Sequence, residues 1–418
     1  MNVLFVHQSF PAQYQHLARY LGPQQGNQVV FITRSPSGEI PGVRKIVYKP
    51  DRGITPQIHY YLADTEAAVL NAQEVARIAI GLRDNGFVPD VILGHNSWGE
   101  IWYLKDIFPQ TKLIGYFEFY YSLPGAAIGF DPELPIKPDD GPRIRTQNLG
   151  NLLGLYSVDV GQCATQWQKS LYPRRYHPIL NVVHEGIDTA VAVPDPAARL
   201  LIPAAQRELA AGDEIVTYVA RNLEPFRGFP SFMRSLPSIL DRRPNAQVVI
   251  VGGDDVSYGQ RLPNNQTYRQ KLLDELKGQI DLSRVHFLGN VPYPVYLKAL
   301  QISRVHVYLT YPFVLSWSVL EAMSAGCLVV GSRTPPVQEV IQDGVNGVLV
   351  DIFSPREIAE RVIEALEDKG AHDAIRLNAR QTIVDRFDLR TVCLPAQLRM
   401  IDDAISLPGG SRAKGTLP

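Results

Sequence analysis

The chain has 418 residues, a formal net charge of −1, 45% hydrophobic residues and 20% charged residues. This length exceeds the roughly 250 to 300 residues that one hydrophobic core usually serves, so the sequence predicts two domains. The composition is that of a soluble globular protein, and neither half carries the basic excess that nucleic-acid binding requires.

The amino terminus, "MNVLFVHQSF", predicts a strand and not a secretory signal, because it has no basic region and its apolar run is short. The sequence nowhere holds about 18 uninterrupted apolar residues, so it predicts no membrane span. Cys163, Cys327 and Cys393 are too few and too scattered for a disulfide framework. We therefore expect a cytoplasmic protein, and a peripheral membrane contact stays open.

Short apolar strands alternate with helical stretches along the whole chain. In the first half the predicted strands are 2–7, 28–34, 90–95, 112–118, 158–164 and 179–186, and the predicted helices include 13–21 and 65–86. In the second half the predicted strands are 214–221, 246–253, 285–289, 305–312, 327–332 and 346–351. This alternation is typical of parallel sheets covered by helices on both faces.

The proline-rich stretch at 188–212 predicts a linker, and the Gly- and Pro-rich stretch at 122–142 predicts a long functional loop. The expected fold class is therefore α/β, with two doubly wound Rossmann-like domains that face each other across a cleft. Their predicted bounds are 1–195 and 196–390, followed by a helix at 391–408 that returns to the first domain and a tail at 409–418. Ligands of such sheets bind at the carboxyl ends of the strands.

Polar residues follow three strands of the first domain. His95 ends the strand at 90–95, Glu118 ends the strand at 112–118, and residues 9–13, "SFPAQ", form the first strand-to-helix turn. All of them are expected to face the cleft. Because histidines at strand ends are more often structural than catalytic, both interpretations of His95 stay open.

In the second domain, Arg221 ends a predicted strand and Arg227 lies in the loop that follows it. Two guanidinium groups at a sheet edge suit a diphosphate, whose oxygens they can bind bidentately; isolated surface arginines are the alternative. Gly252 and Gly253 end the next strand and allow close backbone approach to a ligand, although a plain turn would also explain them.

Glu321 is a single carboxylate in the apolar stretch "YPFVLSWSVLEAMSAG". Ser316 or Ser318 can begin a short helix there and Gly326 can end it. The carboxylate then either reaches solvent or contacts a ligand. The sequence contains no Asp-x-Asp, no dinucleotide or P-loop fingerprint and no histidines at metal-ligand spacing, so we expect no metal and no other cofactor.

Over roughly residues 1–405 the chain resembles the family 4 retaining glycosyltransferases of the GT-B fold. The resemblance is carried by "YVARNLEPFRG", "VVIVGGDD", "VHFLGNVPYPVYLKAL" and "YPFVLSWSVLEAMSAGCLVVGSRTPPVQEVIQDGVNGVLVD". It implies that a sugar moves from a nucleotide-diphosphate sugar to an acceptor hydroxyl, with retention of the anomeric configuration, in glycan or glycoconjugate biosynthesis.

By matching positions, the resemblance implies that Arg221 and Arg227 hold the diphosphate, Arg227 standing where the family usually has lysine. It also implies that Glu321 accepts hydrogen bonds from the ribose hydroxyls, which would satisfy its buried carboxylate. The other implied donor contacts, several of them backbone amides between Val314 and Val319, are Ser316, Trp317, Ser318, Val319, Leu320, Gly252, Gly253 and Gly289.

Three positions depart from the family pattern. Phe313 stands where the family has a glutamate that contacts the transferred sugar, "SFPAQYQ" replaces a glycine pair, and Glu118 replaces a histidine. Glu118 and His95 join Arg221 and Arg227 as candidate catalytic residues.

Two functional hypotheses follow. The first is a metal-independent glycosyltransferase that acts on a glycan, a lipid-linked acceptor or a small molecule. The second is a catalytically weakened nucleotide-sugar binding subunit, which Phe313 and Glu118 motivate. A two-lobed periplasmic binding protein is disfavoured by the missing signal peptide, and the same architecture also serves epimerases and phosphorylases.

Overall fold

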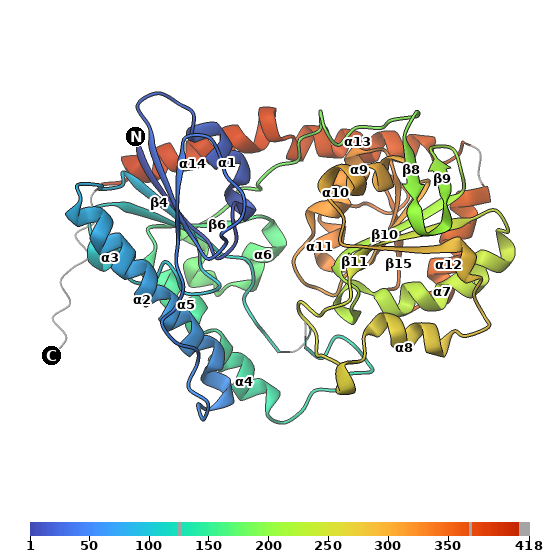
Figure 1. Cartoon of the computed structure of the whole chain (residues 1–418), viewed down its shortest axis with the longest axis horizontal. Helices are drawn as coiled ribbons and strands as arrows, with labels where there is room; N and C mark the ends of the chain where they lie inside the picture. The colour runs from blue at the N-terminus through green and yellow to red at the C-terminus, as the bar shows by residue number, and fades with distance from the viewer. Residues whose placement is uncertain (124, 126–127, 368–369, 409–418) are drawn as a thin grey trace. The chain divides into compact units, whose positions relative to one another are not determined.

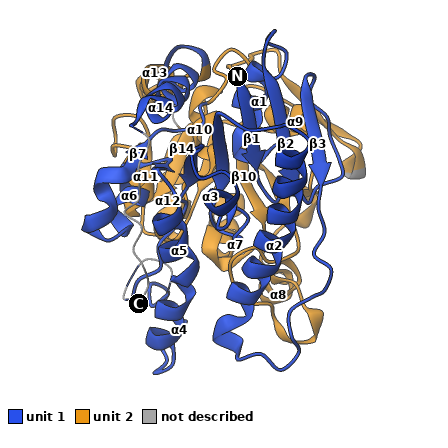
Figure 2. Ribbon diagram, turned by 90° about the vertical axis from the view of Figure 1, so that its left-hand side faces the viewer, with its two compact units in different colours: residues 1–186, 390–418 blue, residues 187–389 orange. Residues whose placement is uncertain are grey.

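The computed structural model describes residues 1–123, 125, 128–367 and 370–408. The chain divides into two compact units, one of Met1–Gly186 with the segment from Arg390 onward and one of Ile187–Leu389 (Figure 2). The first boundary therefore lies at Gly186 and not at residue 195. The reason is that Ile187 pairs with Asp388 in a parallel bridge and is buried in the core of the second unit.

The first unit, which includes the strands labelled β4 and β6 in Figure 1, is built on a seven-stranded parallel sheet. Its strand order is β3-β2-β1-β4-β5-β6-β7. Its strands are β1 (Asn2–Val6), β2 (Gln28–Thr33), β3 (Val43–Val47), β4 (Val91–His95), β5 (Lys112–Tyr116), β6 (Val160–Cys163) and β7 (Leu180–Val182). Its helices are α1 (Gln15–Leu21), α2 (Ala63–Asp84), α3 (Leu104–Ile107), α4 (Asp140–Gln147), α5 (Leu149–Ser157), α6 (Gln166–Leu171) and α14 (Leu394–Ser406). Leu4 and Val6 point into one core and Val3 and Phe5 into another, so apolar layers cover both faces of the sheet.

Helix α14 belongs to the first unit although it ends the described chain. It packs against β5 and α1, and Met400 and Ile401 join the core that contains Val3 and Phe5. Gln397 Nε2 donates to the carbonyl oxygens of His184 and Glu185 at 3.3 and 3.1 Å. The expected tail at 409–418 lies outside the described residues.

The second unit is built on a six-stranded parallel sheet in the order β12-β11-β10-β13-β14-β15. Its strands are β10 (Ile215–Asn222), β11 (Gln247–Gly253), β12 (Val285–Gly289), β13 (Val305–Tyr308), β14 (Leu328–Ser332) and β15 (Val348–Val350). Its helices are α7 (Phe229–Arg242), α8 (Tyr268–Glu275), α9 (Tyr293–Gln301), α10 (Trp317–Ser324), α11 (Pro335–Gln338), α12 (Pro355–Glu367) and α13 (Asp373–Phe387).

The prediction that 188–212 is a linker was wrong. The stretch contains a complete antiparallel hairpin, β8 (Arg199–Ile202) and β9 (Arg207–Ala210), whose Leu200, Ile202 and Leu209 are buried in the core of the second unit. The hairpin was missed because the stretch is rich in proline and small residues, a composition that is also typical of linkers.

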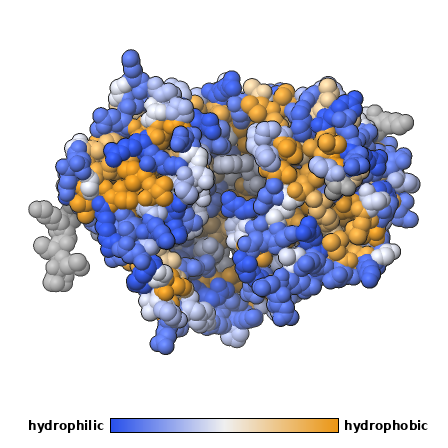
Figure 3. Space-filling model, in the orientation of Figure 1, coloured by the Kyte–Doolittle hydropathy of each residue, from blue (hydrophilic) through white to orange (hydrophobic). Residues whose placement is uncertain are grey.

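The polarity of the surface, the state of the cysteines and the length of the helices follow. Hydrophilic residues cover much of the face of each unit that Figure 3 draws, interrupted by apolar areas. Cys163, Cys327 and Cys393 are buried free thiols. Within the described ranges, no helix is long and apolar enough to cross a membrane.

Candidate functional site

Arg227 lies at the centre of a polar site at the carboxyl end of β10. A 3-10 turn at Pro225–Arg227 follows the strand, and Gly228, with φ of 65°, leads from it into α7. A side chain at Gly228 would place its Cβ 2.4 Å from Leu309 Cβ, so only glycine allows the chain to pass this closely to the end of β13. The turn thereby directs Arg227 toward the loop that precedes α10.

The Arg227 side chain is only 9% exposed. Its Nη1 donates to Thr310 Oγ1 at 2.9 Å, to the Val314 carbonyl oxygen at 3.0 Å and to Tyr308 Oη at 3.3 Å. All three acceptors are formally neutral, and among the described residues no carboxylate pairs with this guanidinium. A buried cation without a counter-charge is costly, so the arrangement favours an anionic ligand.

Glu224 fixes the loop that covers Arg227. It is completely buried, and its carboxylate accepts backbone N–H groups from Ser257, Tyr258 and Gly259 at 3.0, 3.1 and 2.8 Å. The loop follows β11, and it places the Tyr258 ring 5.4 Å from the Arg227 guanidinium carbon. The aromatic face adds a cation–π attraction to the neutral contacts.

Phe313 packs into the same cluster. Its ring is 4.7 Å from the Tyr258 ring and 5.8 Å from the Phe226 ring, and the side chain is 7% exposed. Where the family has a glutamate that contacts the transferred sugar, this chain therefore has a phenylalanine ring packed against two other aromatic rings.

The segment that begins α10 uses some of its own amides. Ser316 N donates to Tyr308 Oη at 2.8 Å, and Ser318 N donates to Ser316 Oγ at 3.3 Å in the N-cap. These two amides were predicted as ligand contacts but already have intramolecular partners. Val319 and Leu320 are 1% and 0% exposed, so their side chains belong to the core and only their backbone remains a candidate contact.

Glu321, in the second turn of α10, has hydrogen-bond partners for both carboxylate oxygens. Its Oε1 accepts from Tyr293 Oη at 2.8 Å and its Oε2 from Tyr296 Oη at 2.6 Å, both tyrosines belonging to α9. Burial raises the pKa of Glu321, and the two hydroxyls oppose that rise. The prediction that a ribose is needed to satisfy this carboxylate was therefore wrong, because α9 does so.

The remaining predicted residues of the second unit are less engaged. Arg221 is exposed at the end of β10 and has no hydrogen-bond partner among the described residues. A Cβ at Gly252 would lie 2.7 Å from the Ala220 carbonyl oxygen, and one at Gly253 2.6 Å from Asn222 Oδ1, so both glycines are explained by packing. Gly289 has φ of 66° and open space beside it.

In the first unit, His95 is buried among aromatic rings. It is 0% exposed, and its ring stacks on Trp98 and Tyr116 at centroid distances of 4.6 and 5.1 Å. Desolvation and the neighbouring His7 lower its pKa well below the usual value, so the imidazole is neutral. This environment suits a packed structural histidine better than a proton acceptor in contact with substrate.

Glu118 lies beyond the end of β5 and approaches the same ring. Its Oε2 is 3.8 Å from His95 Nε2, and its side chain is 27% exposed. The structure thus brings His95 and Glu118 together, and only Glu118 is accessible. Within the described chain, no group of three or more His, Cys, Asp or Glu side chains is arranged to hold a metal ion.

Four residues of the site were not predicted from the sequence: Glu224, Tyr258, Tyr293 and Tyr296. The tyrosines at 293 and 296 have a signal, because residues three apart share one face of a helix. No sequence signal marks Glu224 and Tyr258. The hydrogen bond from Tyr258 N to the Glu224 carboxylate depends on how the loop after β11 folds back.

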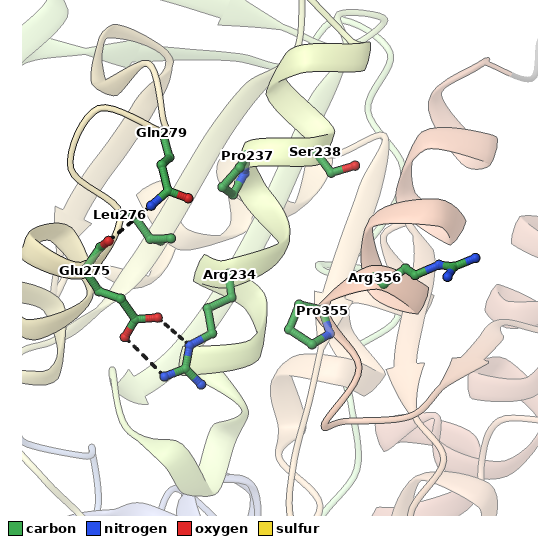
Figure 4. Close-up of a pocket in the computed structure, with 8 residues that line it drawn as sticks. All are labelled: Arg234, Pro237, Ser238, Glu275, Leu276, Gln279, Pro355 and Arg356. Carbon is green, nitrogen blue, oxygen red and sulfur yellow. Dashed lines mark hydrogen bonds and ion pairs between the residues drawn. The ribbon is translucent and has the colours of Figure 1, made fainter.

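A surface hollow of about 470 Å³ lies elsewhere in the second unit, lined by residues of α7 and α8 and by the start of α12 (Figure 4). Arg234 there already pairs with Glu275 at 2.6 Å, and Arg356 is 88% exposed and pairs with Glu360. The hollow shares no residue with the Arg227 cluster, so we assign it no role in the chemistry.

Both units match known sequence families. The sequence model described as "Glycosyl transferase family 4 group" matches residues 25–192, and the one described as "Glycosyl transferases group 1" matches residues 204–382. An uncharacterized glycosyltransferase of Methanocaldococcus jannaschii is 28% identical over 134 residues, which cover 32% of each chain.

A GDP-mannose-dependent alpha-(1-6)-phosphatidylinositol monomannoside mannosyltransferase of Mycolicibacterium smegmatis is 23% identical over 315 residues, 72% of this chain and 75% of the relative. The crystal structure of the Anabaena protein HepE in complex with UDP superposes with a TM-score of 0.68 at 16% identity and covers 96% of this chain and 100% of that chain. This likeness confirms the predicted fold class, two Rossmann-like α/β domains of the GT-B type.

Proposed function

The chain belongs to the family 4, group 1 glycosyltransferases, and from that premise we propose that it is a retaining enzyme that moves a sugar from a nucleotide-diphosphate sugar to an acceptor hydroxyl. The observation that carries the proposal is Arg227, a buried guanidinium without a carboxylate partner among the described residues. A diphosphate supplies the missing negative charge and oxygen acceptors with the geometry that guanidinium prefers.

In this proposal positive charge drives the chemistry. Loss of a nucleoside diphosphate leaves an oxocarbenium-like sugar, so catalysis depends on stabilising the departing phosphate oxygens. Arg227 is held by three acceptors and cannot swing away, whereas the exposed Arg221 is free to close on a bound diphosphate. The arginines take the role that a divalent cation has in other transferases, and the proposal includes metal independence.

The donor and acceptor classes rest on the relatives. The named relative is a GDP-mannose-dependent alpha-(1-6)-phosphatidylinositol monomannoside mannosyltransferase, and the Anabaena structure contains UDP. We therefore place the enzyme in glycan or glycoconjugate biosynthesis in the cytoplasm, with a glycan, lipid-linked or small-molecule acceptor. A lipid-linked acceptor would bring it to the inner face of the membrane. Glu321 is the proposed ribose contact, and the proposed nucleobase is uracil or guanine.

A second candidate is a nucleotide-sugar binding subunit with weakened catalysis. The observation in its favour is Phe313, whose ring is buried against Tyr258 and Phe226 and offers no polar atom to a sugar hydroxyl. Turnover separates the two candidates, because a binding subunit retains the nucleotide sugar and releases no nucleoside diphosphate.

The test measures release of UDP or GDP from a panel of nucleotide sugars with an acceptor extract, with and without EDTA. We expect turnover that EDTA leaves unchanged and that Arg227→Ala lowers by about 100-fold, as for loss of one preorganised donor to a developing oxyanion. Arg227→Lys keeps the charge and should retain more activity than Arg227→Ala.

Arg356→Ala is the matched control, because Arg356 is 88% exposed in the same unit and does not contact the Arg227 cluster. Full activity in Arg227→Ala would refute the diphosphate role. Tight binding of the nucleotide sugar by the unmodified protein, without release, would favour the binding subunit.

A further inference from the structure

Two tyrosines on one face of α9 hold the carboxylate of Glu321. Tyr293 and Tyr296 each donate to a different oxygen, at 2.8 and 2.6 Å, and their rings lie 5.6 Å apart. Tyr296 packs against the core of the second unit, whereas Tyr293 is 47% exposed. The carboxylate is thus fixed from one side, by one helix.

This arrangement leaves acceptor capacity on both oxygens. An ionised carboxylate accepts about four hydrogen bonds, and the tyrosines use one on each oxygen. The tyrosines leave one acceptor site on each oxygen unused, and two hydroxyls on adjacent carbons can each donate to one of these sites. A ribose presents such a pair at its 2′ and 3′ positions, and a 2′-deoxyribose does not.

Hydrogen bonds alone orient this carboxylate. Among the described residues, no arginine, lysine or histidine forms an ion pair with Glu321. Hydrogen bonds to the charged form favour ionisation of a buried acid, and each tyrosine also removes a degree of rotational freedom from the side chain. Without the two tyrosine hydroxyls, the Glu321 carboxylate would be less ionised and its orientation would be less fixed.

We propose that Tyr293 and Tyr296 are positioning residues that act through Glu321 and make the site select ribonucleotides over 2′-deoxyribonucleotides. The inference rests on the proposed nucleotide-sugar function, in which Glu321 contacts the ribose. Neither tyrosine hydroxyl needs to touch the nucleotide, because both are directed at the carboxylate.

The experiment measures Kd by titration calorimetry for UDP, GDP and their 2′-deoxy counterparts, using the full chain. We expect the unmodified protein to bind the ribonucleotide with a Kd about tenfold or more below that of the deoxynucleotide. A hydrogen bond to a charged group usually contributes this much to affinity. Glu321→Gln should reduce that preference to about one. Tyr296→Phe should reduce it by about fivefold and change the Kd for the deoxynucleotide by less than about twofold.

Tyr268→Phe is the control, since this tyrosine of α8 donates to the Gln260 carbonyl oxygen and not to Glu321. If Tyr296→Phe fails to fold, Tyr293→Phe tests the same contact at a half-exposed position. A Tyr→Phe variant that weakens both nucleotides equally, or keeps the full preference, would overturn the proposal and leave the proposed function standing. No binding of any nucleotide by the unmodified protein would overturn both.

Discussion

Glu100 is a buried acid outside the proposed chemistry. It follows β4 in the first unit, is 0% exposed, and its Oε1 accepts from Tyr48 Oη at 2.8 Å. Desolvation raises its pKa to about 7, and the hydrogen bond from Tyr48 and the charge of Arg34 oppose that rise. The folded protein therefore holds this proton more tightly than the unfolded chain does.

This difference predicts a pH dependence of stability. Because the pKa is raised in the folded state, the free energy of unfolding should be greatest below about pH 4.5 for this group and should fall by roughly 3 kcal/mol as the pH rises to about 7. Urea unfolding of Glu100→Gln should lack that component. Tyr48→Phe removes a hydrogen bond that lowers the pKa, so it should extend the fall to higher pH. Identical pH profiles for Glu100→Gln and the unmodified protein would contradict the assignment.

At the scale of elements, Glu224 links the turn after β10 to the loop after β11. Its carboxylate accepts three backbone N–H groups, those of residues 257–259, so one side chain orders the loop that carries Tyr258. Charge-assisted bonds of this kind are about twice as strong as neutral ones.

Glu224→Ala should release this loop. We expect faster amide hydrogen exchange at residues 257–259, because these groups lose their acceptor, and a destabilisation of about 2 to 3 kcal/mol. The exchange of amides within β14 should stay unchanged. Unaltered protection at residues 257–259 would mean that other contacts hold the loop.

At the scale of the whole chain, α14 completes a unit whose seven sheet strands all lie within Met1–Gly186. Ile401 is 1% exposed in the core that also contains Val3 and Phe5. The first unit therefore cannot bury its core until the last described helix has been made.

Ile401→Ala should destabilise the first unit by about 2 to 5 kcal/mol, through lost apolar burial and the cavity left behind. Hydrogen exchange should rise in β5 and α1, against which α14 packs. Leu377→Ala on α13 is the control, because Leu377 is 71% exposed. An effect on the second unit alone would contradict this placement of α14.

Most of the fold could be predicted because buried parallel strands are continuous apolar runs. The twelve predicted strands correspond to β1, β2, β4 to β7 and β10 to β15. Strand β3 was missed because it is an edge strand with Arg44 and Lys45 among its apolar residues, and β8 and β9 because proline-rich flanks conceal them.

The site could be predicted less completely. Residue type and position near strand ends were enough to select Arg227, His95 and Glu118, because parallel sheets gather such residues at one edge. Glu321 was selected as a single carboxylate in an apolar stretch. These signals could not separate the buried Arg227 from the exposed Arg221, nor show that tyrosines already satisfy Glu321.

The sequence by itself determined the α/β class, the two-unit plan and the residue types of the candidate site, since these follow from local periodicity and from short motifs. Tertiary structure alone decided which guanidinium is desolvated, which groups hold Glu321 and Glu224, and where the chain passes between its units. These depend on contacts between residues far apart in sequence, such as Ile187 with Asp388 and Arg227 with Thr310, and local pattern carries no information about such contacts.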